Sequence, residues 1–199
     1  GAPQAVAGDT YAPTTSFQFT NGEQINADTI PYVVLPRQAI GKDKKGNTIW
    51  ASPDNVKGNP FHDAGIKRGD YVRVTNSETG KSIYAIYGEN GPAKDVGEIS
   101  MAAARGLGIN DSPISGGFTE TTDSKYLTYE FFPGSGKRSE NGSRIQTQSA
   151  AEIEKNGRIA AGGRSKVGGF VIASGNDTVL IGMERQPVSL LTWDAADAY

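Results

Sequence analysis

Residues 84–108 read YAIYGENGPAKDVGEISMAAARGLG, and this stretch decides the fold. Apolar and polar side chains alternate in its first part, which is typical of a half-buried strand. Ser100 stands where a helix N-cap is expected, and Gly108 ends the alanine-rich run as a C-cap. The sequence therefore predicts a strand that turns into a short helix, with Glu89 and Glu98 on either side of the turn.

Two carboxylates that converge where a strand meets a helix can share general-acid and general-base work. Paired carboxylates are also the usual apparatus for cleaving glycosidic bonds. On spacing alone a second interpretation stays open, in which Glu89 and Glu98 are solvated surface charges, because glutamate is common on protein surfaces.

Other β-branched and aromatic runs, bounded by turn residues, indicate further strands. A hairpin turn is expected at 76–80 and another turn at 174–177. Helices are expected at 100–107, at 148–155 with Gly157 as the end, and after Pro187. Six strands are predicted in all: Tyr32–Leu35, Asp70–Thr75, Ser82–Gly88, Tyr126–Phe132, Gly169–Ala173 and Thr178–Met183.

The remaining segments are loops. Residues 37–69 form a long polar loop with a turn at 41–46, and loops of that length are often functional. Residues 1–13, which are rich in small residues and proline, are interpreted as a flexible N-terminal arm. We expect residues 14–199 to form a single domain, since this length supports one core.

Five segments of the chain resemble glycoside hydrolase family 75, the fungal-type chitosanases, and especially their cysteine-free bacterial members. They occur in the family's order and read IPYVVLP at 30–36, GDYV at 69–72, AIYGENGP at 85–92, GEIS at 97–100 and YEFFPGSG at 129–136.

This resemblance implies an endo-acting, inverting hydrolase that cleaves the β-1,4 linkages of chitosan. The family's two essential acids map onto Glu89 and Glu98, although Glu89 stands where the family usually has an aspartate. We assign Glu98 as general acid and Glu89 as general base. Four further residues are expected to serve the substrate, with Asn90 and Ser100 orienting the carboxylates and Asp70 and Tyr87 contacting sugar hydroxyls.

The segment from Glu89 to Gly108 also resembles the double-psi β-barrels of expansins and rare-lipoprotein-A-type enzymes. We therefore expect a mainly β fold, a six-stranded double-psi β-barrel with short helices and long loops. Two alternatives stay open: a peptidoglycan-active hydrolase or lytic transglycosylase, and a non-hydrolytic, expansin-like carbohydrate-binding module.

Composition limits the partners. A formal charge of −2 and scattered basic residues give no footprint for nucleic acid. The apolar runs are too short to span a membrane, and no signal segment begins the chain. The absence of cysteine excludes thiol chemistry, and a single histidine excludes a histidine-rich metal site, so we expect no metal and no cofactor. We expect an extracellular monomer, its signal peptide removed, whose partner is a polysaccharide.

Overall fold

The structure is a computed structural model that describes residues 15–91, 97–112 and 127–162, together with the backbone of three strands at 170–173, 178–181 and 189–192. The predicted arm at 1–13 and the turn at 174–177 lie outside these residues. Among the described residues, no helix has the length and apolar character that a membrane crossing needs.

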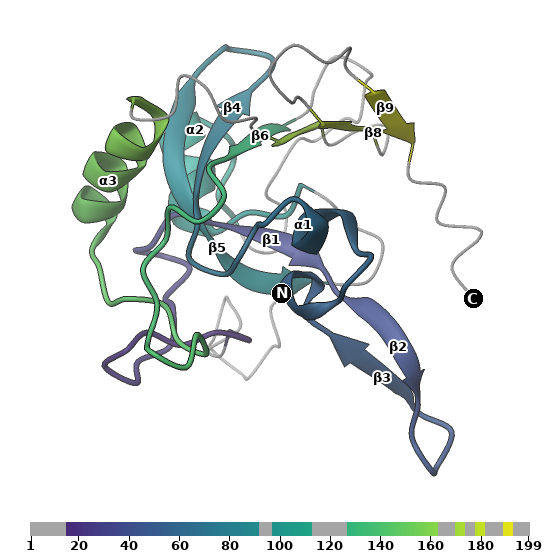
Figure 1. The fold of residues 1–199 in the computed structure, drawn as a ribbon. Coiled ribbons are helices and arrows are strands. Elements are labelled where there is room, and N and C mark those ends of the chain that lie inside the picture. Colours follow the sequence, from purple (N-terminus) through teal and green to yellow (C-terminus); the bar gives the residue numbers. More distant parts are fainter. Residues whose placement is uncertain are drawn as a thin grey trace.

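The described strands form one curled mixed sheet and one separate hairpin (Figure 1). The sheet order is β1-β5-β4-β6-β7-β8-β9, in which β1 runs parallel to β5 and every other neighbouring pair is antiparallel. The sheet strands are β1 (Tyr32–Pro36), β4 (Tyr71–Asn76), β5 (Ser82–Gly91), β6 (Leu127–Phe131), β7 (Phe170–Ala173), β8 (Thr178–Ile181) and β9 (Ser189–Thr192).

The prediction of a mainly β fold is confirmed, and each of the six predicted strands is present with shifted ends. The described sheet has seven strands instead of six, however, and a closed double-psi barrel is not confirmed. The seventh strand, β9, lies after Pro187, where a helix was expected; that prediction was wrong, because the segment pairs with β8 from Ser189 to Thr192.

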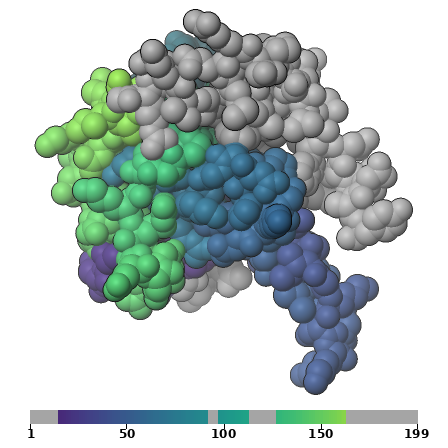
Figure 2. All heavy atoms as spheres, viewed as in Figure 1, coloured from purple at the N-terminus to yellow at the C-terminus, as the bar shows by residue number. Residues whose placement is uncertain are grey.

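The predicted loop at 37–69 is also corrected, since it contains four short elements. They are β2 (Gln38–Lys42), β3 (Thr48–Ala51), the 3-10 helix η1 (Pro53–Asn55) and α1 (Pro60–Asp63). β2 and β3 pair as an antiparallel hairpin around the predicted turn, and this hairpin projects from the body of the molecule (Figures 1 and 2).

Two longer helices pack on opposite faces of the sheet. α2 (Met101–Leu107) begins at Ser100 and ends at Gly108 as predicted. α3 (Ala150–Gly162) runs past Gly157, which was wrongly expected to end it. A β-carbon on Gly106 of α2 would lie 3.1 Å from the side chain of Ile83, and one on Gly157 would lie 2.6 Å from that of Tyr84. Successive strand residues project to opposite faces, so α2 and α3 cover different sides of β5.

The α2 side of the sheet is the inner face, and it holds the hydrophobic core. Residues paired across β1, β5, β4 and β6 point inward together and exclude solvent completely: Val33, Val72, Val74, Ala85, Tyr87, Tyr129 and Phe131. Tyr129 and Phe131 meet edge to face, with ring centroids 6.2 Å apart. This core fixes β5, the strand that carries Glu89.

Candidate functional site

A β-bulge near the end of β5 sets the direction of the candidate site residues. Val33 of β1 pairs with Tyr87, but Val34 pairs with Glu89, so Gly88 is an extra residue on β5. Register partners share a face of the sheet, and Val33 and Val34 face opposite ways. Tyr87 therefore points to the inner face, whereas Glu89 points to the outer face.

Glycine is required at the bulge because the outer face is crowded there. A β-carbon on Gly88 would lie 2.7 Å from Cβ of Tyr32, closer than real side chains approach. The extra residue also places Asn90 on the inner face, beside Tyr87, and Gly91 on the outer face, beside Glu89.

Glu98 reaches the same outer face from the other side of β1. Residues 98–100 run along the free edge of β1, where the Val34 amide donates to the Glu98 carbonyl at 3.0 Å and the Ser100 amide donates to the Tyr32 carbonyl at 3.0 Å. Glu98 lies just before the N-terminus of α2, so the helix start and the strand edge together fix its backbone.

The Glu98 carboxylate lies over Gly91. A β-carbon on Gly91 would be 2.9 Å from Oε2 of Glu98 and 2.7 Å from Cγ1 of Val34. The missing side chain of Gly91 thus makes the space that the carboxylate occupies. Gly91 is two residues along β5 from Glu89, so their α-carbons are about 6.6 Å apart along the strand.

The phenol of Tyr32 lies near both acids. Burial raises the pKa of Tyr32, and the negative charges of Glu89 and Glu98 raise it further. Both carboxylates therefore act on one buried phenol, which keeps its proton and remains a hydrogen-bond donor. Only its place in a predicted strand marks Tyr32 in the sequence.

Glu89 is covered by the chain that precedes the sheet. Its side chain is buried, with 4% of the residue exposed. The Ser16 amide donates to Oε1 at 2.9 Å and to Oε2 at 3.0 Å, and the Asn90 amide donates to Oε1 at 2.7 Å. The ring of Phe17 packs edge-on against Tyr87, with centroids 5.3 Å apart, and anchors this cover.

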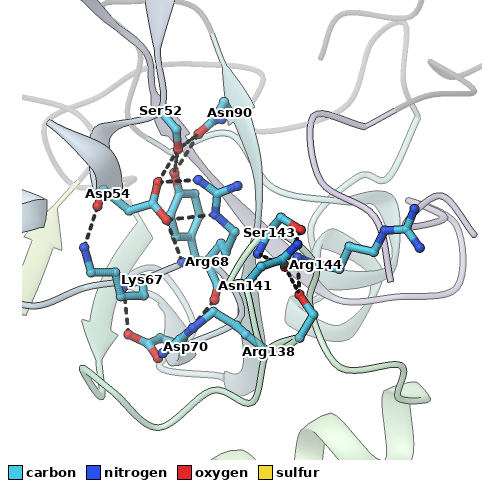
Figure 3. Close-up of polar contacts among 12 residues, drawn as sticks. Ser52, Asp54, Lys67, Arg68, Asp70, Asn90, Arg138, Asn141, Ser143 and Arg144 are labelled. Carbon is cyan, nitrogen blue, oxygen red and sulfur yellow. Dashed lines mark hydrogen bonds and ion pairs between the residues drawn. The ribbon is translucent and has the colours of Figure 1, made fainter. Parts of the chain in front are cut away.

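A polar network on the inner face supports the end of β5 (Figure 3). Oδ1 of Asn90 accepts hydrogen bonds from the Tyr87 hydroxyl at 2.6 Å and from the Ser52 hydroxyl at 3.1 Å. Ser52 also contacts Asp54, whose carboxylate accepts from Nε of Arg68 at 3.0 Å and from Nη2 at 3.1 Å. The residue next to Glu89 is thereby tied to a buried ion pair.

Charge and burial compete within this network. Burial raises the pKa of the Asp54 carboxyl, but hydrogen bonds from Arg68 and Ser52 and the charge of Arg68 outweigh it and hold that pKa below its usual value. The Arg68 guanidinium lies 4.4 Å from the centre of the Phe17 ring, a cation–π contact that joins the ion pair to the cover over Glu89.

Two of the four predicted substrate residues lie in the interior instead. Tyr87 and Asp70 are fully buried, and Tyr87 faces away from the two glutamates. Asp70 accepts backbone N–H bonds from Lys67 at 2.8 Å and from Gly134 and Gly136 at 2.9 Å, so its carboxylate has no access to a sugar. Burial raises the pKa of Asp70.

Ser100 caps α2. Its hydroxyl oxygen accepts from the Ala103 amide at 3.1 Å and from the Tyr32 amide at 3.0 Å, which fixes the backbone on which Glu98 stands. Asn90 is half-buried beside Glu89 and donates its own amide to that carboxylate. Ser100 and Asn90 therefore position the two acids, Ser100 through the backbone and Asn90 directly.

Sequence reasoning missed two residues at the base of the β2–β3 hairpin. The amide and Nε of Arg37 both donate to the Gly91 carbonyl, at 3.2 Å and 3.1 Å. The Arg37 guanidinium lies 5.6 Å from the ring centre of Trp50, which is 43% exposed. The sequence signal that could have identified Trp50 is the presence of a tryptophan in a long polar segment.

Among the residues that the structure describes, no group of three or more histidine, aspartate or glutamate side chains could hold a metal ion. A scan against protein-family models gives no match, and a search of curated proteins gives none either.

Proposed function

We propose that the protein is an endo-acting glycoside hydrolase that uses Glu98 as general acid and Glu89 as general base. The observation that carries the proposal is that both carboxylates lie on the outer face at one end of β5, with Glu98 over Gly91. The substrate is a β-1,4-linked amino-sugar polymer, and chitosan is the polymer that the family resemblance implies. We further propose that the protein acts outside the cell as a monomer.

Inversion is the stereochemical outcome that the family resemblance implies. Carboxyl groups about 6.5–9.5 Å apart leave room for the attacking water of an inverting enzyme, whereas about 5–5.5 Å suits a retaining one. The stereochemistry of the product therefore tests this part of the proposal.

The hydrogen bonds of Glu89 support the base role. Two backbone N–H groups, from Ser16 and Asn90, donate to this carboxylate, so it acts as an acceptor. A general base must likewise accept a proton from the attacking water. The hydrogen bond from the Asn90 amide holds the Glu89 side chain close to its own strand. Glutamate is one methylene longer than aspartate, and this conformation shortens its reach.

The finer description of the fold, a double-psi β-barrel, belongs to the same proposal. The parallel β1–β5 pair within an otherwise antiparallel sheet supports it.

A reducing-end assay on chitosan, colloidal chitin and peptidoglycan tests the activity. Glu98→Gln and Glu89→Gln should each lower kcat by about 10²–10⁴-fold, the usual contribution of general acid–base catalysis. An activated aryl glycoside should rescue Glu98→Gln alone, because a good leaving group needs no acid. The matched control is Glu140→Gln, a change at an exposed glutamate.

Rescue of Glu89→Gln instead would reverse the two roles. Binding to these polymers without any reducing-end release by the wild type would overturn the hydrolase and favour a non-hydrolytic binding module.

One observation favours a second function, a lytic transglycosylase of peptidoglycan, which needs only one acid. Glu89 is buried under Ser16, whereas Glu98 is only partly buried. Near-normal activity of Glu89→Gln on cell-wall sacculi, together with loss of activity in Glu98→Gln, would establish this alternative.

A further inference from the structure

The β2–β3 hairpin exposes large apolar side chains. Ile40 is 55% exposed, Ile49 42% and Trp50 43%. The hairpin projects from the body of the molecule (Figure 2), so these side chains lie away from the core. Large apolar side chains exposed on a projecting element indicate contact with a partner.

The tip of the hairpin is held in a defined shape. Oδ1 of Asp43 accepts from the amides of Lys45 and Asn47, both at 2.8 Å, and Oδ2 accepts from the Asn47 side chain at 3.0 Å. Gly46 supplies the left-handed backbone of the turn, with φ of 84°. The backbone that carries the lysines of the tip is therefore ordered before a ligand binds.

The hairpin has a positive formal charge, whereas the rest of the chain has a negative one. Residues 37–51 contain four basic side chains (Arg37, Lys42, Lys44 and Lys45) and one acidic side chain (Asp43), a formal charge of +3. The whole chain carries −2, which leaves −5 on the remainder. An arm of this sign attracts anionic groups and repels a polycation.

The base of the hairpin joins the candidate site. Arg37 binds the Gly91 carbonyl and lies against Trp50, and Gly91 lies beneath the Glu98 carboxylate. Trp50 is the exposed tryptophan beside Arg37 in the described structure. A glycan bound across the two acids would therefore lie next to its ring.

We propose that the β2–β3 hairpin is a substrate subsite for a carboxylate-bearing amino-sugar polymer, such as a peptidoglycan strand. The Trp50 ring stacks on a sugar, and Lys44 and Lys45 pair with carboxylates of the polymer. This inference rests on the proposed glycan activity and narrows its substrate, since the charge of the arm favours an acidic strand over polycationic chitosan.

Co-sedimentation with Glu98→Gln protein, which binds without turnover, tests the proposal. The probes are purified peptidoglycan sacculi, the same sacculi with their carboxylates amidated, and chitosan. Lys44→Gln with Lys45→Gln should weaken binding to untreated sacculi about tenfold, since each exposed pair contributes up to about 1 kcal/mol. It should leave binding to amidated sacculi unchanged. Trp50→Ala should weaken binding to both forms about tenfold.

The matched control is Lys81→Gln with Lys155→Gln, which removes the same charge from exposed positions on the β4–β5 turn and on α3. Equal binding of amidated and untreated sacculi, or an equal loss in the control, would overturn the subsite. Tighter binding to anionic lipid vesicles or to DNA than to sacculi would overturn it in favour of those partners.

The assay separates this inference from the proposed function. If the wild type cleaves a glycan and the hairpin variants cleave it equally well, the subsite is refuted and the hydrolase proposal stands. Hairpin-dependent binding without any cleavage by the wild type would refute the hydrolase.

Discussion

The end of β5 and the β2–β3 hairpin meet where Arg37 donates to the Gly91 carbonyl, yet their environments are opposite. Glu89 is 4% exposed and stands beside a network of buried hydrogen bonds, whereas Trp50 is 43% exposed on a projecting arm. The position of Glu89 therefore depends on the stability of the fold, whereas the exposed side chains of the arm lie outside the core. A rigid scaffold that carries exposed binding segments is a common arrangement.

The largest expected effect comes from breaking the ion pair behind Glu89. Asp54→Ala should lower the free energy of unfolding by about 3–5 kcal/mol, because it leaves the Arg68 charge buried without a partner. Urea denaturation measures this loss. Asp63→Ala, which removes an exposed carboxylate beside His62, is the control and should cost less than about 1 kcal/mol. Equal losses would mean that the two ion pairs are not energetically distinct.

The Asp54–Arg68 ion pair also predicts that the free energy of unfolding depends on pH. The folded pKa of Asp54 lies below its unfolded value, so its stabilising effect is present above the unfolded pKa and is lost as the pH falls through the folded pKa. The difference in unfolding free energy between wild type and Asp54→Ala should therefore shrink in acid. A difference that grows below about pH 4 would contradict the assigned direction.

The next effect sharpens the position of Glu98. Gly91→Ala should lower kcat about 100-fold, since the new β-carbon would displace a carboxylate that now lies 2.9 Å away, and shifts of about 1 Å cost that much. Gly162→Ala, at a helical glycine with no atom within 4 Å of the new β-carbon, is the control and should leave kcat unchanged. Unchanged turnover in Gly91→Ala would remove Glu98 from the site.

A smaller effect concerns the cover over Glu89. Ser16→Pro removes the amide hydrogen that donates to this carboxylate, and a hydrogen bond to a charged group contributes about 1.5–3 kcal/mol. Thermal unfolding should show a loss in that range, while Ser16→Ala, which keeps the amide, should change stability by less than about 0.5 kcal/mol. A comparable loss in the alanine variant would assign the effect to the side chain.

The smallest effect is expected on the arm. Trp50→Ala should lower the free energy of unfolding by about 1 kcal/mol, because the ring is 43% exposed and its contact with the Arg37 guanidinium contributes about 0.5–1 kcal/mol. Chemical denaturation checks this. A loss above about 2 kcal/mol would show that the hairpin packs on the body, and the contrast between the two regions would fail.

Much of the sheet can be predicted from sequence because its signals are local. Alternation and turn residues locate the strands, and Ser100 and Gly108 bound α2 as caps. Gly157 shows where local reading fails. Its residue type suggests a helix end, but in the structure Gly157 lies inside α3. Glycine is needed there because a β-carbon would lie 2.6 Å from the side chain of Tyr84.

The candidate site is harder to predict because it depends on pairing between distant segments. Sequence indicates Glu89 and Glu98, but their shared face depends on the register of β1 against β5. Asp70 and Tyr87 have the residue types of substrate contacts, yet both are buried. The hairpin escapes prediction since its strands expose their apolar residues instead of alternating between core and solvent.

The extra residue at Gly88 has a consequence for protein engineering. On a straight strand Glu89 would share the face of Tyr87 and point into the core, and only the bulge turns it outward. Grafting residues 87–91 onto an unbulged scaffold would therefore bury the acid, whereas deleting Gly88 would remove the extra residue and leave Glu89 and the residues after it on their present faces.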